Sequence, residues 1–364
     1  MGQAAEDTRF MRRALELAER GRRTVSPNPL VGCVVVADGR VVGEGWHARA
    51  GGPHAEVVAL AAAGPAARGA TVYVTLEPCA HHGRTGPCTT ALLEAGVARV
   101  VAAHADPHPD ARGGADVLRA AGVAVEVGLL ADEAAAQNEV FLHGVATGRP
   151  FVIAKAATSL DGRIAAADGT SRWLTGPETR QRVHALRAEV DAVLVGSGTV
   201  LADDPALTVR LPGVDGPQPL RVVLDGRGRV RPPARVVSDG AATVVYTRGE
   251  TGSAGTAEHV GVPGGADGGV DLDAVLADLW DRDVRSVLVE GGAAVLGSFL
   301  RAGLVDRLEV HVAPVLLGAA GRPLLDGPWA TTLADAPRFT PRNVVRVGDD
   351  AVLSVTPVRV AEEV

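Results

Sequence analysis

The sequence predicts an α/β protein with two domains, and three observations lead to this prediction. The chain has 364 residues, whereas single hydrophobic cores rarely grow beyond about 250–300 residues. Its first part contains a hairpin pattern followed by alternating helix and strand patterns, an order that is typical of layered α/β sheets. A second series of strand and helix patterns begins at Phe151.

The first domain is expected over residues 1–147 as a three-layer α/β/α domain. Asp7 can cap a helix whose apolar side carries Phe10, Met11, Ala14, Leu15, Leu17 and Ala18. VGCVVVADGRVVGEGWH (31–47) predicts two strands around an Asp-Gly turn. The segment HGVATGRP (143–150) is expected to link the domains. Further helices are expected at 54–64, 89–96 and near 111–121, and strands at 71–75, 98–104 and 123–127.

The second domain is expected over residues 148–364 and is again of the α/β class. Its strand patterns are short and apolar, as is typical of strands that are buried on both faces. The segment 249–270 is rich in Gly and Ala and is expected to be a mobile loop. The predicted strands cover 151–160, 191–197, 220–226, 242–248, 286–292 and 306–314, and the predicted helices cover 177–189, 271–280 and 293–302.

Composition argues against several classes of protein. A net charge of −7 gives no overall attraction to polyanions, so no nucleic-acid partner is expected. The N-terminal residues lack the apolar region of a signal peptide, and no apolar run reaches the about 18 residues that a membrane span needs. We therefore expect a cytoplasmic protein without a membrane partner. Three cysteines are too few for a disulfide scaffold, and Cys33 in VGCVVV fits a small buried core residue.

Lys155 is the only lysine of the chain, although arginine is abundant. The lysine is there either by chance or because the position needs a compact ammonium group, which a planar guanidinium cannot replace.

A candidate metal site lies in LEPCAHHGRTGPC (76–88) and in PHAE (53–56) upstream of it. Zinc prefers thiolate and imidazole ligands, and a catalytic zinc site has three protein ligands and one open position. His54, Cys79 and Cys88 could supply these ligands. Glu56 follows His54 by two residues, so it is better placed beside the zinc-bound water than as a fourth ligand.

This arrangement suits a hydrolytic deaminase, in which an activated water attacks an amidine-like ring carbon and a carboxylate carries the proton to the departing ammonia. Two structural alternatives remain open. His81 or His82 could complete a closed zinc site, or the two cysteines could simply be buried without a metal.

The combination of HAE with PC…C resembles the cytidine-deaminase superfamily, from which this chain departs by eight residues between Cys79 and Cys88. Together with SPNPLVGCVV (26–35), GEGWH (43–47) and TLEPCAHHGRTGPC (75–88), this longer form closely resembles the deaminase half of the bifunctional riboflavin-biosynthesis deaminase–reductases. The resemblance covers residues 5–145.

The resemblance implies that His54, Cys79 and Cys88 bind one zinc ion per chain and that Glu56 is the proton shuttle. It also implies that Asn28 and His47 contact the pyrimidine substrate. In the longer loop, His81, His82 and Arg84 could reach the sugar phosphate of a nucleotide, because a guanidinium matches a phosphate dianion. Each of these three could equally be a solvated loop residue.

The second half contains four further motifs: KAATSLDGR (155–163), SRWLT (171–175), GSGTVLADDPALTVR (196–210) and VEGGAAVLGSFL (289–300). In the last of these, a strand runs through Gly291 and Gly292 into a helix, a geometry in which backbone amides can approach a phosphate. A simple helix cap would also explain one of these glycines. Asp203 and Asp204 precede a proline, which is often only a turn. No Walker-type GK[ST] sequence supports ATP chemistry.

As a set, these motifs closely resemble the riboflavin-pathway reductase domain, a relative of the dihydrofolate reductase fold, over residues 148–358. The resemblance implies that NADPH delivers a hydride to C1′ of the opened ribosylamino group. It places Lys155 near the reacting centre, with Lys155 and Asp203 as candidates for acid–base work. The implied substrate residues are Arg187, Leu207, Arg210 and Glu290, and the implied NADPH residues are Ala157, Ser171, Trp173, Thr199, Asp203, Gly292, Ala293, Ala294, Val295, Leu296, Gly297 and Ser298.

The function implied by both resemblances is two consecutive steps of riboflavin biosynthesis. The first deaminates 2,5-diamino-6-(5-phosphoribosylamino)pyrimidin-4(3H)-one to 5-amino-6-(5-phosphoribosylamino)uracil, and the second reduces that product to 5-amino-6-(5-phosphoribitylamino)uracil. A homo-oligomer, either a dimer or a tetramer, is expected. Two alternatives stay open: a nucleoside or tRNA deaminase fused to a folate-type reductase, and a non-catalytic nucleotide-binding protein.

Overall fold

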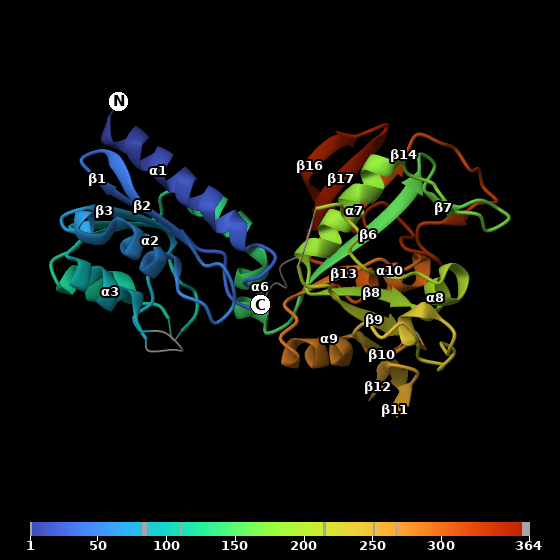
Figure 1. The fold of residues 1–364 in the computed structure, drawn as a ribbon. Coiled ribbons are helices and arrows are strands. Elements are labelled where there is room, and N and C mark those ends of the chain that lie inside the picture. Colours follow the sequence, from blue (N-terminus) through green and yellow to red (C-terminus); the bar gives the residue numbers. More distant parts are fainter. Residues whose placement is uncertain are drawn as a thin grey trace. The chain divides into compact units, whose positions relative to one another are not determined.

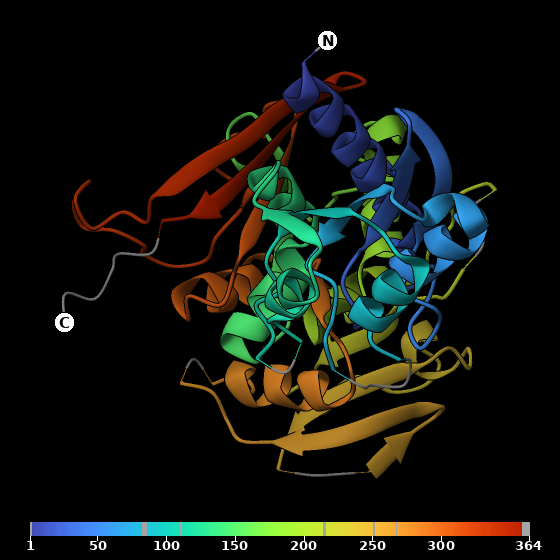
Figure 2. The same ribbon diagram turned by 90° about the vertical axis from the view of Figure 1, so that its left-hand side faces the viewer.

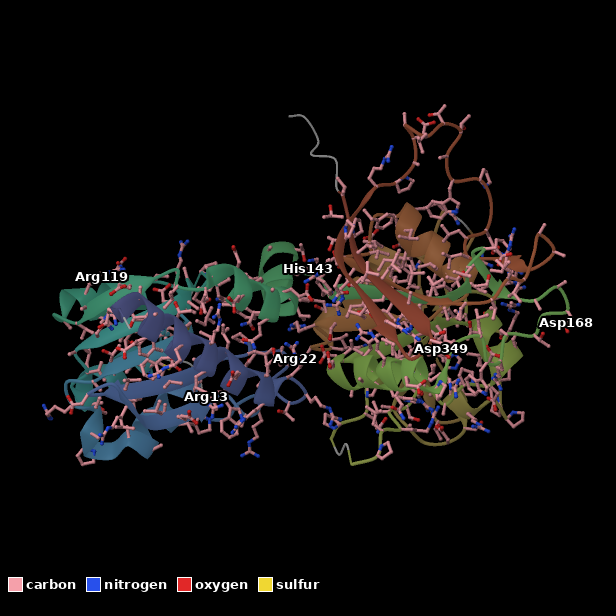
Figure 3. The ribbon with its side chains drawn as sticks, turned by 90° about the horizontal axis from the view of Figure 1, so that it is seen from above. Arg13, Arg22, Arg119, His143, Asp168 and Asp349 are labelled. Carbon is pink, nitrogen blue, oxygen red and sulfur yellow. The ribbon has the colours of Figure 1, made fainter. Side chains whose placement is uncertain are left out.

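The computed structural model describes residues 2–81, 86–109, 111–213, 216–249, 252–266 and 268–358. The chain divides into two compact units, Met1–Gly148 and Arg149–Val364. Figure 1 shows the first unit in blue to green and the second in green to red. Charged side chains such as the exposed Arg119 and Asp168 extend from the surface of the units (Figure 3). Among the described residues, none of the helices combines the length and the apolar character of a membrane span.

The first unit is built on a five-stranded sheet in the order β2-β1-β3-β4-β5. The first three neighbours pair in an antiparallel manner, and β3, β4 and β5 are parallel. Asp38 and Gly39 both have positive φ in the turn of the predicted hairpin. The strands are β1 (Gly32–Ala37), β2 (Arg40–Trp46), β3 (Thr71–Leu76), β4 (Arg99–His104) and β5 (Ala124–Val127).

Helices cover both faces of this sheet, which confirms the predicted three layers. Alternate residues of β1 enter different cores: Cys33 packs with the helices on one face, and Val34 packs with α1 on the other. Gly32 and Gly45 permit close contact with the helices, since a Cβ atom on Gly45 would lie 2.5 Å from the carbonyl oxygen of Ala55. The helices are α1 (Gln3–Ala18), α2 (Ala55–Ala63), α3 (Cys88–Ala95), α4 (Gly114–Ala120), α5 (Ala131–Gln137) and α6 (Glu139–Thr147).

Two local predictions for this unit are wrong. Asp7 does not cap α1, because the helix begins four residues earlier, at Gln3. Instead Asp7 is buried and accepts hydrogen bonds from both Nη atoms of Arg99, at 2.9 and 2.8 Å, which lowers its pKa well below the usual range. The expected linker at 143–150 is helical up to Thr147, where α6 ends before Gly148 with a φ of +69°. The division between the two units, after Gly148, does fall within this segment.

The second unit contains a ten-stranded sheet in the order β11-β12-β10-β9-β8-β13-β6-β14-β17-β16 (Figures 1 and 2). The central strands from β12 to β14 are parallel, and the edges carry antiparallel pairs. Its strands are β6 (Phe151–Ser159), β8 (Ala192–Gly196), β9 (Leu220–Leu224), β10 (Thr243–Arg248), β11 (Gly252–Ala254), β12 (Ala257–Val262), β13 (Ser286–Val289), β14 (Arg307–Ala313), β16 (Phe339–Val347) and β17 (Asp350–Pro357).

Among the described residues, four α-helices accompany this sheet, and two short strands pair beside it. Apolar side chains of α9 and α10 share a core with the buried residues of β6, β8 and β13. The parallel strands align their carboxyl ends at one edge, which is where ligands bind in open α/β sheets. The helices are α7 (Pro177–Glu189), α8 (Ser197–Asp203), α9 (Leu272–Asp281) and α10 (Ala293–Arg301), and the short strands are β7 (Arg163–Ala165) and β15 (Arg322–Pro323).

The prediction of a mobile loop at 249–270 is also wrong. It contains β11 and β12, and β12 pairs in parallel with β10 from Glu258 to Val262. Ala257 and Val262 are buried, so apolar residues anchor both ends of β12 in spite of the glycines around it. The hairpin of β16 and β17 was not predicted, because β16 is almost entirely exposed and lacks an alternating apolar pattern.

Two candidate active sites

Three potential metal ligands converge where helices begin in the first unit. His54 is the residue before α2, Cys88 is the first residue of α3, and Cys79 follows β3. Their ligand atoms all lie within 4.8 Å of one another. His54 Nδ1 is 3.1 Å from Cys88 Sγ and 3.6 Å from Cys79 Sγ. Ligand atoms around a tetrahedral zinc ion are separated by roughly 3.5 Å, so this nitrogen and the two sulfurs fit zinc.

The two thiols are free and differ in acidity. Cys79 Sγ accepts a hydrogen bond from the backbone N–H of Cys88, at 3.4 Å. A side-chain hydrogen bond with Cys88 lowers the pKa of Cys79 to about 4, and the same contact raises the pKa of Cys88. Cys79 is therefore ready to act as a thiolate ligand.

Glu56 lies in the first turn of α2, and its side chain is only 3% exposed. Burial raises its pKa. Among the described residues, the set of ligand atoms within 4.8 Å of one another does not include Glu56. This arrangement agrees with a proton carrier next to the metal site rather than a fourth ligand.

Asn28 and His47 lie next to this cluster. His47 Nδ1 is 3.0 Å from the carbonyl oxygen of Pro53, so this nitrogen carries the proton and donates it. His47 Nε2 must then accept the hydrogen bond from the Asn28 amide, also at 3.0 Å. The rings of His47 and His54 contact edge to face, with centroids 5.6 Å apart. The amide oxygen of Asn28 stays free of this chain of hydrogen bonds and can face a substrate.

Sequence reasoning missed the role of Glu77, which immediately follows β3. Its buried carboxylate accepts hydrogen bonds from the backbone N–H groups of Asp106 at 3.1 Å, Gly113 at 3.1 Å and Ala115 at 2.8 Å. It thereby caps α4 from another segment and fixes the chain just before Cys79. The signal in the sequence was the glutamate of the EPC motif. A glutamate in this motif that does not bind the metal needs another partner.

The long loop between the two cysteines is described only in part. His81 is exposed and does not join the metal ligands. His82 and Arg84, which were expected to reach a sugar phosphate, lie outside the described residues.

In the second unit, Lys155 and Glu290 occupy equivalent positions along two neighbouring parallel strands. Lys155 follows Ala154 of β6, which is paired with Val289 of β13, and Glu290 follows Val289. Burial lowers the pKa of Lys155, although Glu290 opposes this effect. Burial alone would raise the pKa of Glu290, but its hydrogen bonds with Arg187 lower it.

Four predicted substrate residues are linked around one short segment. Arg187 of α7 forms a bidentate ion pair with Glu290, at 2.6 and 2.9 Å, and donates to the carbonyl oxygen of Thr208 at 3.1 Å. Leu207 is buried with a φ of +53°. Arg210 is exposed and donates to Thr208 Oγ1 at 3.1 Å. Because Glu290 occupies the fork of Arg187, Arg210 is the more available cation for a phosphate.

A buried charged cluster beside Lys155 was not predicted. Glu309 of β14 is in register with Lys155, and the fully buried His311 lies two residues further on the same face. Glu309 Oε2 is 3.4 Å from both Arg182 Nη2 and His311 Nε2. The signal was the alternation in RLEVHVA, which puts both polar residues on one face of a strand whose other residues are mostly apolar.

The predicted NADPH residues fall into two groups. In the first, Arg172 connects Ser171 and Trp173 to α8, since its Nη2 lies 3.1 Å from Asp203 Oδ1. Trp173 is 71% exposed, and the guanidinium carbon of Arg180 lies over its ring, 4.7 Å from the centroid. Thr199 lies on α8 and Ala157 on β6, in register with His311.

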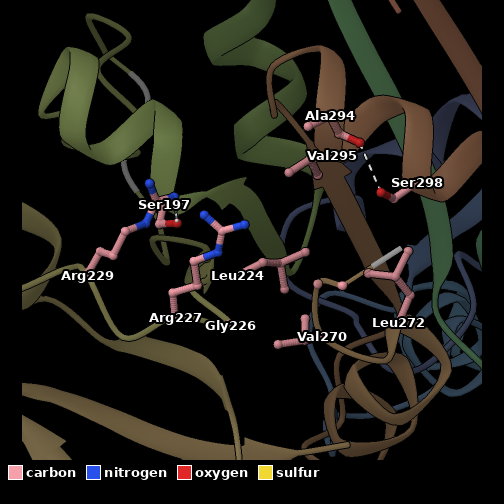
Figure 4. Close-up of a pocket in the computed structure, with 12 residues that line it drawn as sticks. Ser197, Leu224, Gly226, Arg227, Arg229, Val270, Leu272, Ala294, Val295 and Ser298 are labelled. Carbon is pink, nitrogen blue, oxygen red and sulfur yellow. Dashed lines mark hydrogen bonds between the residues drawn. The ribbon is translucent and has the colours of Figure 1, made fainter. Parts of the chain in front are cut away.

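The second group is the stretch from Gly292 to Ser298, which begins at the residue before α10. Ala294, Val295 and Ser298 of this stretch line a pocket together with residues of α8 and of the segment after β9 (Figure 4).

Comparison with known proteins gives matches over nearly the whole chain. Residues 4–104 match the cytidine and deoxycytidylate deaminase zinc-binding region, and residues 150–353 match the RibD C-terminal domain. The riboflavin biosynthesis protein RibD of Escherichia coli K12 is 47% identical over 363 residues, which cover 96% of this chain and 98% of that protein. RibD of Mycobacterium tuberculosis H37Rv is 45% identical over 348 residues, which cover 94% and 95%.

Two solved structures resemble the chain equally broadly. RibD of Acinetobacter baumannii has a TM-score of 0.89 at 40% identity and covers 98% of this chain and 100% of its own. A diaminohydroxyphosphoribosylaminopyrimidine deaminase/5-amino-6-(5-phosphoribosylamino)uracil reductase from Thermotoga maritima has a TM-score of 0.90 at 38% identity, with the same coverage.

Proposed function

The chain belongs to the RibD family of riboflavin-biosynthesis enzymes, and on that premise we propose how its residues carry the two activities of a deaminase and a reductase. Residues 1–147 form the deaminase and residues 148–364 the NADPH-dependent reductase. The substrates are those in the name of the Thermotoga maritima relative, a phosphorylated diaminopyrimidine and the phosphoribosylaminouracil made from it. The observation that carries the proposal is the His54–Cys79–Cys88 group with Glu56 buried close by.

In the deaminase, His54, Cys79 and Cys88 hold one zinc ion. These three residues would leave one coordination position of the metal open for water, and the chemistry that zinc would supply there is a lowered pKa of that water. Glu56 takes a proton from the attacking water and passes it to the amino group that leaves as ammonia. Its buried position supports this role, because burial raises the pKa of Glu56 and so makes its carboxylate a stronger proton acceptor than an exposed one.

Asn28 and His47 orient the pyrimidine ring. The Asn28 amide nitrogen donates to His47, so its oxygen is left to accept a hydrogen bond from a substrate amino or ring N–H group. His81 and Arg84 contact the sugar phosphate, which would explain why the loop between the cysteines is longer than in PCxxC deaminases.

In the reductase, the chemistry that bound NADPH would supply is a hydride for C1′ of the ring-opened imine. The nitrogen of that imine then requires a proton, which the Lys155 ammonium donates and later recovers from water. Its lowered pKa supports this role, because a more acidic ammonium gives up its proton more readily. Glu290 and Leu207 hold the substrate, Arg187 fixes Glu290, and Arg210 binds the phosphate. The cofactor would be held by Ala157, Ser171, Trp173, Thr199, Asp203 and the stretch 292–298.

One anaerobic assay tests the function. The diaminopyrimidine ribonucleotide is supplied with NADPH, and ammonia and NADPH absorbance are followed together. Ammonia release should precede NADPH oxidation, and both should reach one equivalent per substrate. Activity on a free nucleoside or on tRNA alone would favour a nucleoside or tRNA deaminase, and binding without turnover would favour a nucleotide-binding protein.

We also propose that the protein is a cytoplasmic homo-oligomer, a dimer or a tetramer, that binds no nucleic acid. Cys79 and Cys88 form no disulfide, and their thiols persist in this form in a reducing compartment. The strand β16 lies at the edge of its sheet and exposes Val344 to 65%, and an edge strand can pair with a second chain. The net charge of −7 argues against a polyanionic partner. Light scattering in solution would report the mass of the assembly.

A further inference from the structure

The segment 206–210 carries two of the proposed substrate residues, Leu207 and Arg210, and it belongs to neither a helix nor a strand. It runs between α8 and β9, so no ladder of backbone hydrogen bonds fixes its shape. Leu207 has a φ of +53°, a conformation that residues other than glycine rarely adopt. Such a backbone persists only where the surrounding structure holds it in place.

Two arginines bind carbonyl oxygens of this segment. Arg221 of β9 is 1% exposed, and its Nη1 donates to the carbonyl oxygen of Ala206 at 3.3 Å. Arg187 of α7 donates to the carbonyl oxygen of Thr208 at 3.1 Å. Each of these guanidinium groups is also paired with a carboxylate. The segment is therefore attached to side chains that are themselves fixed.

Gln218 pairs with the backbone of the next residue in the segment, Val209, as a neighbouring strand would. Its Oε1 accepts a hydrogen bond from the Val209 N–H at 2.7 Å, and its Nε2 donates to the Val209 carbonyl oxygen at 3.3 Å. Val209 is also buried. The segment is thus fixed as far as Val209, without any contribution from Arg210.

His184 of α7 holds the last residue of the segment. The Arg210 backbone N–H donates to His184 Nδ1 at 3.2 Å, so this ring nitrogen carries no proton. Burial lowers the pKa of His184, and the positive charges of Arg187 and Arg210 lower it further, against the opposing effect of Glu290. The ring therefore stays neutral and keeps its acceptor.

The guanidinium of Arg210 depends on this backbone for its direction. Arg210 is exposed, and its Nη1 donates to Thr208 Oγ1 at 3.1 Å. Glu290, the carboxylate that acts on Arg210, is already paired with Arg187. The guanidinium is thus left for an anion from outside the chain, and the backbone at Arg210 sets where that anion binds.

We propose that His184 is a positioning residue of the reductase, whose hydrogen bond to the Arg210 backbone directs the Arg210 guanidinium to the phosphate of the substrate. The inference rests on the proposed function, in which Arg210 binds this phosphate, and adds the residue that places Arg210. A guanidinium binds a phosphate through two parallel hydrogen bonds, so the orientation of Arg210 sets the affinity as well as its charge.

The kinetic test compares His184→Leu and His184→Asn with the wild-type enzyme. NADPH oxidation is measured with the deaminated substrate and with its dephosphorylated form. His184→Leu should raise KM for the phosphorylated substrate roughly three- to tenfold, the range expected for one lost hydrogen bond. Its kcat, and its kcat/KM for the dephosphorylated form, should stay within about twofold of the wild type.

His184→Asn is the conservative variant. Asparagine carries its amide oxygen on Cγ, the atom that carries Nδ1 in histidine, so this oxygen can accept the same N–H and the wild-type KM should return. Gln181→Leu is the matched control, because Gln181 is an exposed polar residue of the same helix, and it should behave like the wild type. Thermal unfolding shows whether each variant is folded.

A double-mutant cycle with Arg210→Gln shows whether His184 acts through Arg210. In the Arg210→Gln background, His184→Leu should cause no further loss. The proposal would be overturned by a further loss in that background, by equal losses for the two substrates, by an unchanged KM in His184→Leu, or by a KM that His184→Asn does not restore.

Hydrogen exchange separates this inference from the proposed function. Peptides that contain the Arg210 amide should exchange faster in His184→Leu than in the wild type, and at the wild-type rate in His184→Asn. If exchange does not change, His184 does not hold Arg210 and the inference fails. If exchange rises but Arg210→Gln affects the two substrates equally, the proposed phosphate role of Arg210 fails and the contact with His184 is only structural.

Discussion

Arg187 and Glu290 form a bidentate ion pair, with Nε–Oε1 at 2.6 Å and Nη2–Oε2 at 2.9 Å. Both side chains are nearly buried, at 11% and 10% exposed. A buried pair of this kind contributes little net stability, but removal of one partner leaves the other charge uncompensated. The pair therefore fixes the orientation of Glu290 next to Lys155 rather than adding to the free energy of unfolding.

Arg187→Leu should accordingly lower the stability of the second unit by about 3–5 kcal/mol, the usual effect of breaking a buried ion pair. It should also reduce kcat/KM of the reductase, because Glu290 loses its fixed orientation. Thermal unfolding and NADPH oxidation measure the two effects. In the double variant Arg187→Leu/Glu290→Gln, much of the stability should return while the reductase stays impaired. If the single variant Arg187→Leu had the unfolding temperature of the wild type and oxidised NADPH at the wild-type rate, the role given to the pair would be wrong.

Glu56→Gln should abolish deamination and leave the rest of the enzyme intact. Loss of general acid–base catalysis reduces a rate by about 10²–10⁴-fold. The variant should keep its zinc, because Glu56 is outside the set of ligand atoms. It should also still oxidise NADPH with the deaminated substrate. Ammonia release, metal analysis and NADPH absorbance give the three readings, and wild-type ammonia release would refute the proton-shuttle role.

The zinc site makes a separate prediction about cysteines. The purified protein should contain about one zinc ion per chain, and Cys88→Ala should lose both the zinc and the deaminase activity. Cys33→Ala is the matched control, since Cys33 is equally buried but packs in the hydrophobic core. It should keep its zinc and most of its activity. If the enzyme were fully active and metal analysis found no zinc in it, the proposed zinc site would be contradicted.

The two folds and the chemistry of the first site were predictable because their signals are local. His54, Cys79 and Cys88 lie at helix starts or just after a strand, where sequence motifs are short and positions are fixed by the backbone. Asp7 misled the prediction for the opposite reason: an aspartate near a helix start looks like a cap, whereas its partner Arg99 lies 92 residues away. Long-range pairing of this kind leaves no trace in a single local pattern.

The second site was less accessible to sequence reasoning, since its polar network depends on the register between strands. Glu309 faces Lys155 only because β14 pairs with β6 in parallel. The arginines of the pocket were missed too, because Arg227 and Arg229 follow β9 in a chain that uses arginine almost everywhere for positive charge. The strand β12 was hidden by surrounding glycines that are common in loops.

The last prediction concerns the pH dependence of the reductase. Burial lowers the pKa of Lys155 and Arg187 lowers it further, while Glu290 and Glu309 raise it. The pKa of Lys155 is lowered overall. His311 and Arg182 contact Glu309 from the same strand and from α7. If the Lys155 ammonium donates the proton, kcat must fall as the pH rises through the lowered pKa of Lys155, since the neutral amine has no proton to give.

Glu309→Gln removes one of the charges that stabilise the ammonium, so the alkaline fall in kcat should move to lower pH while the acidic side stays unchanged. Glu178→Gln is the matched control, because Glu178 lies on α7, the helix of Arg182, but is exposed and does not act on Lys155. The profile is measured as NADPH oxidation at saturating deaminated substrate. A purely structural role of Glu309 would lower kcat equally at every pH, and a shift of the alkaline limb to higher pH would exclude Lys155 as the proton donor.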